Sequence, residues 1–170
     1  MKSHNGMRPQ DIVILLKIIA LGDQKWQYRD LASQLYISIS EISESLNRSA
    51  IAGLYDSHFK KIRRNALLEF IQYGLPYVFP QIPGALVTGV STTHSHPFYK
   101  KHLISNENMV WPYPDGDSRG QAIEALHKGV PRAAMEDELL YLLLASVDIL
   151  RVGRVRERTI ATKELQKYLR

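Results

Sequence analysis

Apolar residues recur in short periodic stretches over the first third of the chain, and each stretch predicts a helix. The stretch Pro9–Leu21 (PQDIVILLKIIAL) is apolar on most of its faces, carries Asp11 in its first turn and is followed by Gly22. This pattern predicts a central core helix that ends at the glycine. The stretch Tyr28–Leu35 (YRDLASQL) has apolar residues at helical spacing, which predicts a second, shorter helix.

A third helix is predicted over residues 38–52, after a tight turn at residues 36–38. Ser38 and Glu41 have the spacing of a capping box, in which the serine oxygen accepts from a free backbone N–H and the glutamate reaches back to the cap. Gly53 ends the helix. The short basic and aromatic segment that follows, residues 55–62 (YDSHFKKI), has the length of a reduced hairpin.

The middle of the chain differs in composition from its two ends. Asn65 is expected to cap a fourth helix that closes at Gly74. Seven of the eight prolines then lie between residues 75 and 131, which predicts mostly loop. Two short apolar pieces, residues 85–90 and 109–111, are candidate strands.

Two helices are predicted at the end of the chain. Residues 136–151 are apolar nearly all round, which indicates burial on several sides or in an oligomer interface. Their longest apolar run, residues 139–150, contains Asp148 and is shorter than the roughly 20 residues that cross a bilayer, so we expect no membrane association. A basic helix follows over residues 155–169.

These elements predict a mainly α fold with few short strands. Residues 1–64 are expected to form a winged helix-turn-helix domain. Residues 65–170 are expected to form a Pro-rich loop region and a C-terminal helical pair, which would dimerise, sense a ligand or bind a partner.

The composition is that of an ordinary globular protein, with 45% apolar and 23% charged residues among 170. The absence of cysteine excludes a disulfide framework, a thiolate metal site and a cysteine nucleophile, and it agrees with a reducing cytoplasm. The first ten residues lack an apolar stretch after a basic start, so we expect no secretory signal.

The net charge of +5 is unevenly distributed. Residues 1–65 hold 10 basic against 6 acidic side chains, and residues 151–170 hold 7 against 2, whereas residues 66–150 hold 5 against 9. Two basic ends around an acidic middle indicate polyanion contact at one or both ends.

Residues 28–54 have the pattern of a helix-turn-helix. Such a motif needs apolar contacts between two helices, a small residue where their axes approach and a turn of three or four residues. Ala32 is the small residue, and residues 36–38 are the turn. The apolar contacts are expected from Leu31, Leu35, Ile37, Ile42 and Leu46.

On these residues the sequence resembles the winged helix-turn-helix domains of bacterial MarR-like and Lrp-like regulators. The resemblance covers roughly residues 9–64 and rests on LASQL, Ser38, the inner-face pair Ile42 and Leu46, and the ending Ala-Gly-Leu at residues 52–54. It implies a cytoplasmic transcriptional regulator that binds double-stranded DNA. This sequence departs from the pattern at Tyr36, where these families usually have glycine, and in its short wing.

The helical period predicts which side chains of the third helix point outward, away from an inner face of Ile39, Ile42 and Leu46. Asn can read adenine, Arg can read guanine or hold phosphate, and Glu can accept from cytosine. The predicted reading residues are Ser38, Ser40, Glu41, Ser43, Glu44, Asn47 and Arg48. The predicted phosphate contacts are Lys25, Arg29, Lys60, Lys61, Arg63 and Arg64. A homodimer is expected, because two-fold half-sites raise affinity and specificity.

Four arginines, at positions 151, 154, 156 and 158, follow the buried helix that carries Asp148. One hypothesis is an anion site formed by Arg151, Arg154, Arg156 and Arg158. A compatible hypothesis is that one of them pairs with Asp148, because an unpaired buried carboxylate is expensive.

Two alternatives to the DNA-binding hypothesis remain open. One is an antitoxin-like or other protein-interaction module, in which the helix-turn-helix is secondary. The other is an enzyme with its site in residues 94–117, where His94 and His96 lie two apart; two such histidines can bind zinc, but polar loop histidines are the simpler interpretation. We found no nucleophile motif, phosphate loop or recurring metal spacing, and therefore expect no catalytic site, metal or cofactor.

Overall fold

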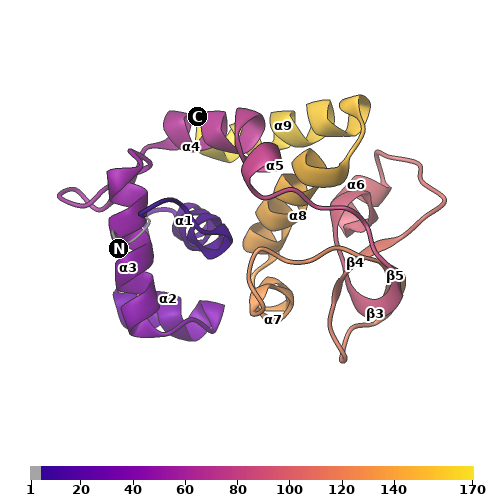
Figure 1. The fold of residues 1–170 in the computed structure, drawn as a ribbon, viewed down its shortest axis with the longest axis horizontal. Helices are drawn as coiled ribbons and strands as arrows, with labels where there is room; N and C mark the ends of the chain where they lie inside the picture. The colour runs from indigo at the N-terminus through magenta and orange to yellow at the C-terminus, as the bar shows by residue number, and fades with distance from the viewer. Residues whose placement is uncertain (1–4) are drawn as a thin grey trace.

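The computed structural model describes residues 5–170, and its first part consists of three helices in the order that the sequence predicts. The helices are α1 (Pro9–Leu21), α2 (Tyr28–Leu35) and α3 (Ile39–Ile51). α1 is buried along nearly its whole length, because its apolar residues are spread around its circumference. α2 and α3 pack on each other and on α1, which places α1 in the centre of this part of the molecule (Figure 1).

A small hairpin follows α3. Strands β1 (Tyr55–Asp56) and β2 (Lys61–Ile62) pair antiparallel, with Tyr55 opposite Ile62. Helix α4 (Arg64–Tyr73) begins directly after β2, with Arg63 at its N-cap. The predicted cap at Asn65 is therefore wrong: the N–H of Arg63 donates to the Leu54 carbonyl at 2.9 Å, and this bond holds the chain so that the helix starts before Asn65.

The Pro-rich segment contains more regular structure than its composition predicts. It forms helix α5 (Leu75–Val78), strand β3 (Leu86–Ser91), the 3₁₀ turn η1 (Thr93–Ser95), helix α6 (Pro97–Lys100), and strands β4 (Met109–Pro112) and β5 (Ser118–Ala122). The two candidate strands are confirmed as β3 and β4. β5 was not predicted, because its sequence SRGQA lacks apolar alternation.

Each of the three strands pairs with the other two. β3 is antiparallel to both β4 and β5, and β4 and β5 run parallel over a short stretch. Gly89 makes this closure possible, because a Cβ atom there would lie 1.9 Å from the Trp111 carbonyl oxygen.

The end of the chain is helical. Short helix α7 (Val130–Met135) leads into α8 (Glu138–Val152) and α9 (Val155–Leu169), which pack on each other and confirm the predicted helical pair. α8 starts two residues later than predicted, because the Asp137 carboxylate caps it by accepting from the N–H of Leu140 at 3.0 Å. No helix within residues 5–170 is long and apolar enough to cross a membrane.

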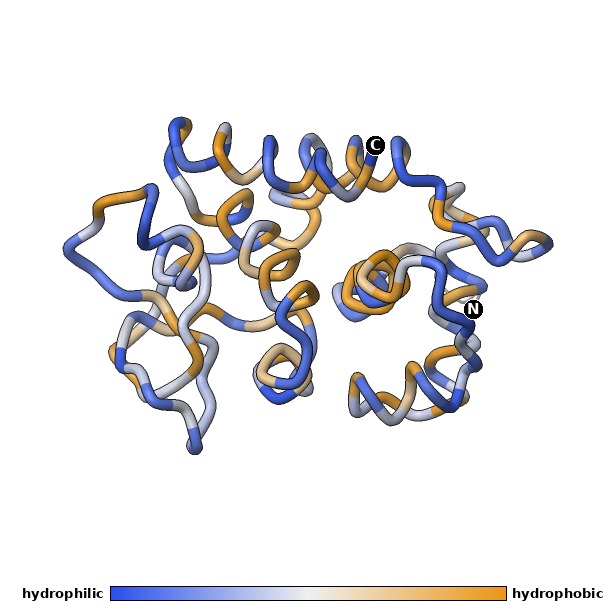
Figure 2. The backbone as a smooth tube through the Cα atoms, turned by 180° about the vertical axis from the view of Figure 1, so that it is seen from behind, coloured by the Kyte–Doolittle hydropathy of each residue, from blue (hydrophilic) through white to orange (hydrophobic). Residues whose placement is uncertain are grey.

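One hydrophobic core joins the two halves of the chain. α1 and α8, the most hydrophobic helices, lie in the interior (Figure 2), and α1 contacts α8. Lys17 on α1 also pairs with Asp137 at 2.6 Å. The helices of the first part are therefore held by residues more than a hundred positions later.

The turn between α2 and α3 is covered by α7. Tyr36 adopts the left-handed conformation (φ 58°) in this turn, which a glycine would adopt without strain. Its hydroxyl donates to Glu136 at 2.5 Å, and the Arg132 guanidinium lies 4.3 Å from its ring centroid. These contacts hold the tyrosine in a backbone conformation that its type rarely adopts.

The close approach of Gly129 to this turn yields a test of the packing. A Cβ atom at Gly129 would lie 2.6 Å from the Leu35 carbonyl oxygen, so Gly129→Ala is expected to lower the free energy of unfolding by about 1–3 kcal/mol. Gly84→Ala is the matched control, since its Cβ would meet only ordinary contacts at 3.7 Å. Urea denaturation followed by circular dichroism measures both; equal stability of the two variants would contradict the packing described.

Candidate nucleic-acid interface

The predicted contacts between α2 and α3 are present. Leu31 and Leu35 of α2 and Ile42 and Leu46 of α3 are buried in the common core. Ser38 caps α3, its Oγ accepting from the N–H of Glu41 at 3.2 Å. Two short helices thus meet across a tight turn, with the N-terminus of α3 at the surface.

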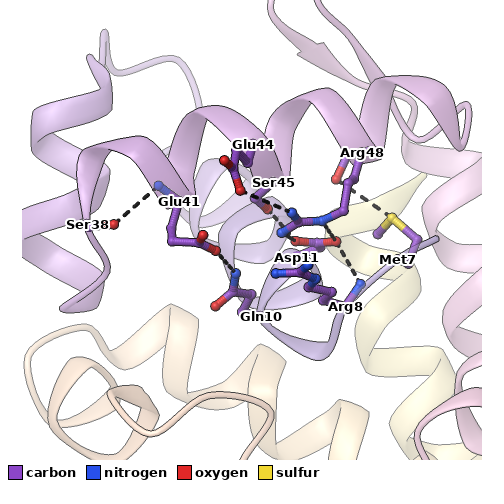
Figure 3. Close-up of polar contacts among 10 residues, drawn as sticks. Met7, Arg8, Gln10, Asp11, Ser38, Glu41, Glu44, Ser45 and Arg48 are labelled. Atoms are coloured by element: carbon purple, nitrogen blue, oxygen red, sulfur yellow. Dashed lines mark hydrogen bonds and ion pairs between the residues drawn. The ribbon is translucent and has the colours of Figure 1, made fainter. Parts of the chain in front are cut away.

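Glu41 does not complete the predicted capping box. Its carboxylate instead accepts from the side-chain amide of Gln10 on α1 at 2.6 Å (Figure 3). Glu41 is half-buried by this contact. The prediction that it lies on the outward face of α3 is therefore wrong.

Arg48 was predicted to point outward, and this prediction is wrong. Its side chain is buried, and its Nε and Nη2 donate to the two carboxylate oxygens of Asp11 at 3.0 and 2.7 Å (Figure 3). Ser45 donates to the same carboxylate at 2.6 Å. These hydrogen bonds to the Asp11 carboxylate hold the pKa of Arg48 above its ordinary value. Positions 41, 45 and 48 therefore form a polar stripe of α3 that faces α1, beside the apolar stripe of Ile42 and Leu46.

The exposed face of α3 is accordingly narrower than predicted and uncharged over most of its length. Ser40, Ser43, Glu44 and Asn47 are exposed, as the helical period predicted. Ile39 was predicted to lie on the inner face, but it is 55% exposed at the start of α3, and Ile51 is 60% exposed at the end of the same helix.

A groove of about 380 Å³ runs beside this face. It is lined by Ser43 and Asn47 from α3, by Tyr28 from α2, and by Tyr55 and Ser57 from the hairpin. Polar groups from three elements are therefore presented on one surface. Tyr55 is only 4% exposed and belongs to the core, whereas Tyr28, which was not predicted as a contact, is 38% exposed.

The cations that were predicted to contact phosphate do not lie in one place. Lys25, Arg29 and Lys60 line one hollow of about 540 Å³, together with Asp23 and Asp30. Lys60 and Lys61 are exposed in the hairpin, and Arg63 lies 3.6 Å from Asp56 across it. Arg64 points elsewhere, since its guanidinium donates to the Tyr168 carbonyl at the end of α9. Arg29 and Lys60 are thus brought together, and Arg64 is not part of their cluster.

The arginines at the end of α8 and the start of α9 also separate into two groups. Arg151 pairs with buried Asp148 at 3.0 Å, as one of the two hypotheses predicted, and it donates to the carbonyls of Phe79 and Glu124. It is not available to an anion. Arg154, Arg156 and Arg158 are exposed at the start of α9.

Asp148 joins the small sheet to α8. Its carboxylate also accepts from the Trp111 indole N–H at 2.6 Å and from the Thr92 hydroxyl at 3.0 Å. Burial raises the pKa of Asp148, and its three hydrogen-bonding partners, Arg151, Trp111 and Thr92, compensate for the loss of water.

His94 and His96 are buried rather than exposed in a loop. The Nε2 of His94 contacts the Glu107 carbonyl oxygen at 2.5 Å, and the Nδ1 of His96 accepts from the N–H of Phe98 at 3.1 Å. One ring nitrogen of each histidine thus contacts a backbone group. Within residues 5–170, no group of three or more His, Asp or Glu side chains is placed to hold a metal ion.

Comparison with protein-family models, with curated proteins and with solved structures yields no match for this chain.

The buried Asp11–Arg48 pair predicts a large loss of stability when one partner is removed. Asp11→Ala is expected to lower the free energy of unfolding by about 3–5 kcal/mol, because Arg48 would lose its buried counter-ion and keep only the exposed Glu44 at 4.0 Å. Replacing both residues, as Asp11→Leu with Arg48→Met, should recover much of that loss. The exposed Asp23→Ala is the control. An Asp11→Ala variant as stable as the control would show that the pair does not hold α3.

His96 predicts a pH-dependent stability. Burial lowers the pKa of His96 from 6.5 to about 4, so the unfolded chain binds a proton between these values that the folded chain does not. Stability should therefore be constant with respect to this group above pH 6.5 and fall by roughly 2–3 kcal/mol as the pH drops to 4. His96→Asn keeps an acceptor for Phe98 and does not titrate. Denaturation at pH 4 to 7 should show a weaker pH dependence for that variant; an unchanged dependence would exclude His96 as its source.

Proposed function

We propose that residues 9–62 form a winged helix-turn-helix and that the protein is a transcriptional regulator which binds duplex DNA with α3 in the major groove. The observation that carries this proposal is the exposed polar face of α3, with Ser43 and Asn47, beside a groove that Tyr28 of α2 and Ser57 of the hairpin also line, while Arg29 and Lys60 of the same two elements line a separate hollow. The order of three helices and a hairpin supports it, as does the basic charge of residues 1–65.

The exposed side chains favour a particular kind of base contact. Asn47 can donate to and accept from adenine, and Glu44 can accept from the amino group of cytosine. Exposed Ile39 and Ile51 can contact thymine methyl groups. With Arg48 buried against Asp11, this face carries no arginine for guanine. We therefore expect A·T pairs to dominate the site that α3 reads.

Phosphate contacts supply the affinity. Arg29 and Lys60 share one hollow on the side of α2 and the hairpin, where they can hold a single strand of the backbone. The slope of log affinity against log salt concentration is negative, and each phosphate contact that is lost should reduce its magnitude by about 0.9. Arg63 and Arg64 contribute less, since both are engaged within the protein.

We further propose that the regulator acts as a homodimer. Two copies of α3 would then read two half-sites related by a two-fold axis. Exposed apolar side chains on α4, α5 and α9, among them Tyr73, Tyr77 and Val155, support association through that side of the molecule. The same exposed apolar surface of α4, α5 and α9 also supports the alternative function, a module that binds a different protein.

Asn47 provides the direct test. Asn47→Ala together with Ser43→Ala is expected to lower affinity for a duplex selected by the wild-type protein by a factor of about 10 or more, because each lost bidentate contact costs about 1–3 kcal/mol. Affinity for unrelated duplexes should stay the same. Asn106→Ala, an exposed asparagine in a remote loop, is the matched control. Fluorescence anisotropy at one fixed salt concentration measures all three.

Unchanged specific affinity in the Asn47 and Ser43 variant would remove α3 from the interface. Failure of the wild-type protein to prefer any duplex would overturn the proposed function itself.

A further inference from the structure

The two basic parts of the chain meet in the folded protein. The guanidinium of Arg64, at the start of α4, donates to the carbonyl oxygen of Tyr168 near the end of α9, although 104 positions separate these residues in the sequence. Figure 1 shows the C-terminus beside α4, and Figure 2 shows the same arrangement from behind. The cations that follow the β1–β2 hairpin and the cations at the end of α9 therefore lie on neighbouring segments.

The solvent-facing side of α9 is a stripe of cations. At 3.6 residues per turn, positions 156, 163, 167 and 170 fall within about 60° of one another around the helix axis. This cationic stripe consists of four exposed residues, Arg156, Lys163, Lys167 and Arg170. The other side of α9 holds the helix on the core through Ala161, Leu165 and Leu169. The packing of α9 therefore does not depend on the stripe, and its charges face solvent.

Acidic side chains neutralise only part of the stripe. Glu164 is buried and pairs with Lys167 at 2.6 Å. Within residues 5–170, ion pairs leave Arg156, Lys163 and Arg170 without an acidic partner. Like charges on one helix face repel one another, so this arrangement favours an anionic partner outside the chain.

The position of the stripe favours duplex DNA as that partner. The end of α9 lies next to Arg64, which comes directly after the hairpin that carries exposed Lys60 and Lys61. Ser57 of the same hairpin lines the groove beside Asn47 of α3. Cations therefore continue from the surface that we place on DNA onto α9. Duplex DNA presents about one phosphate charge per 1.7 Å of its axis, and such a row of charges fits repeated cations better than a compact anion does.

We propose that the end of α9, through Lys167 and Arg170, holds the phosphate backbone of the duplex outside the segment that α3 reads. This inference rests on the proposed function. It extends the DNA interface from residues 9–62 to the last helix of the chain. It also gives the basic charge of residues 151–170 a partner that is independent of base sequence.

The stripe and the apolar surface proposed for association occupy different faces of α9. Val155 points about 100° away from Arg156 around the helix axis. Lys163 lies at the border between the two faces, because it lines a groove with Tyr73 of α4. Lys163 is therefore left unchanged in the test, so that association and DNA contact are varied separately.

The test uses the full chain with Lys167→Gln and Arg170→Gln. Glutamine at position 167 can still donate to Glu164, so the variant removes two charges and leaves that buried carboxylate a donor. Lys101→Gln with Arg119→Gln is the matched control. It removes the same two residue types from exposed positions after α6 and in β5, which lie away from the hairpin and outside the apolar surface of α4, α5 and α9 (Figure 1).

Fluorescence anisotropy measures affinity for two duplexes between about 50 and 200 mM salt. One duplex is the site selected by the wild-type protein, and the other extends this site by about 10 base pairs, one helical turn, on each side. On the extended duplex, the α9 variant should reduce the magnitude of the salt slope by about 1.8 for each protein copy bound, because two phosphate contacts are lost. On the short duplex its slope should equal that of the wild type. The control should match the wild type on both.

Equal slopes of the α9 variant and the wild type on the extended duplex would overturn this inference, and so would an equal change in the control. Thermal melting and sedimentation velocity should show the same stability and oligomeric state for all three proteins; a changed oligomeric state would overturn the inference, since association would then explain the loss. Unchanged DNA slopes together with lost binding to vesicles of phosphatidylserine and phosphatidylcholine would replace DNA by a membrane surface.

This outcome is separable from that of the proposed function. The variant with Asn47→Ala and Ser43→Ala changes the preference between duplex sequences, whereas loss of the α9 contact changes the salt slope on an extended duplex of any sequence. If the wild-type protein prefers no sequence, the proposed function fails, and the comparison on an unrelated extended duplex still decides whether α9 holds phosphate.

Discussion

The ion pair between Asp11 and Arg48 determines how α3 is presented to solvent. Both side chains are buried, and two hydrogen bonds join them. A buried charge pair adds little net stability, but breaking it is expensive, so it acts mainly as a constraint on geometry. Ser45 and Glu41 add further bonds from α3 toward α1. Together they fix the rotation of α3, which leaves Ser43 and Asn47 outward.

The second half of the chain packs against α1 and against the turn before α3, and it thereby supports the helices that position the exposed face of α3. α8 packs against α1, and α7 covers the turn before α3 through Tyr36. Asp148 in turn anchors the small sheet to α8. A change that moved α7 would reach the start of α3 through the Tyr36 contacts.

The sequence was sufficient for features encoded locally. Apolar periodicity located α1, α2 and α3, and Ser38 marked the start of α3, because helical spacing and capping involve neighbouring residues only. Features that depend on distant partners were missed. Arg48 looked exposed because its counter-ion lies 37 residues earlier on another helix. β5 has no apolar alternation that would reveal it in the sequence. It is a strand because its backbone pairs with β3 and β4. The left-handed Tyr36 depends on Glu136 and Arg132.

The central hypothesis is that α3 reads a defined duplex sequence. Repeated selection from a pool of random duplexes by the purified protein, followed by sequencing, tests it most directly. The hypothesis predicts enrichment of one A·T-rich motif, arranged as an inverted repeat if two copies bind. A selected pool with no shared motif would contradict it.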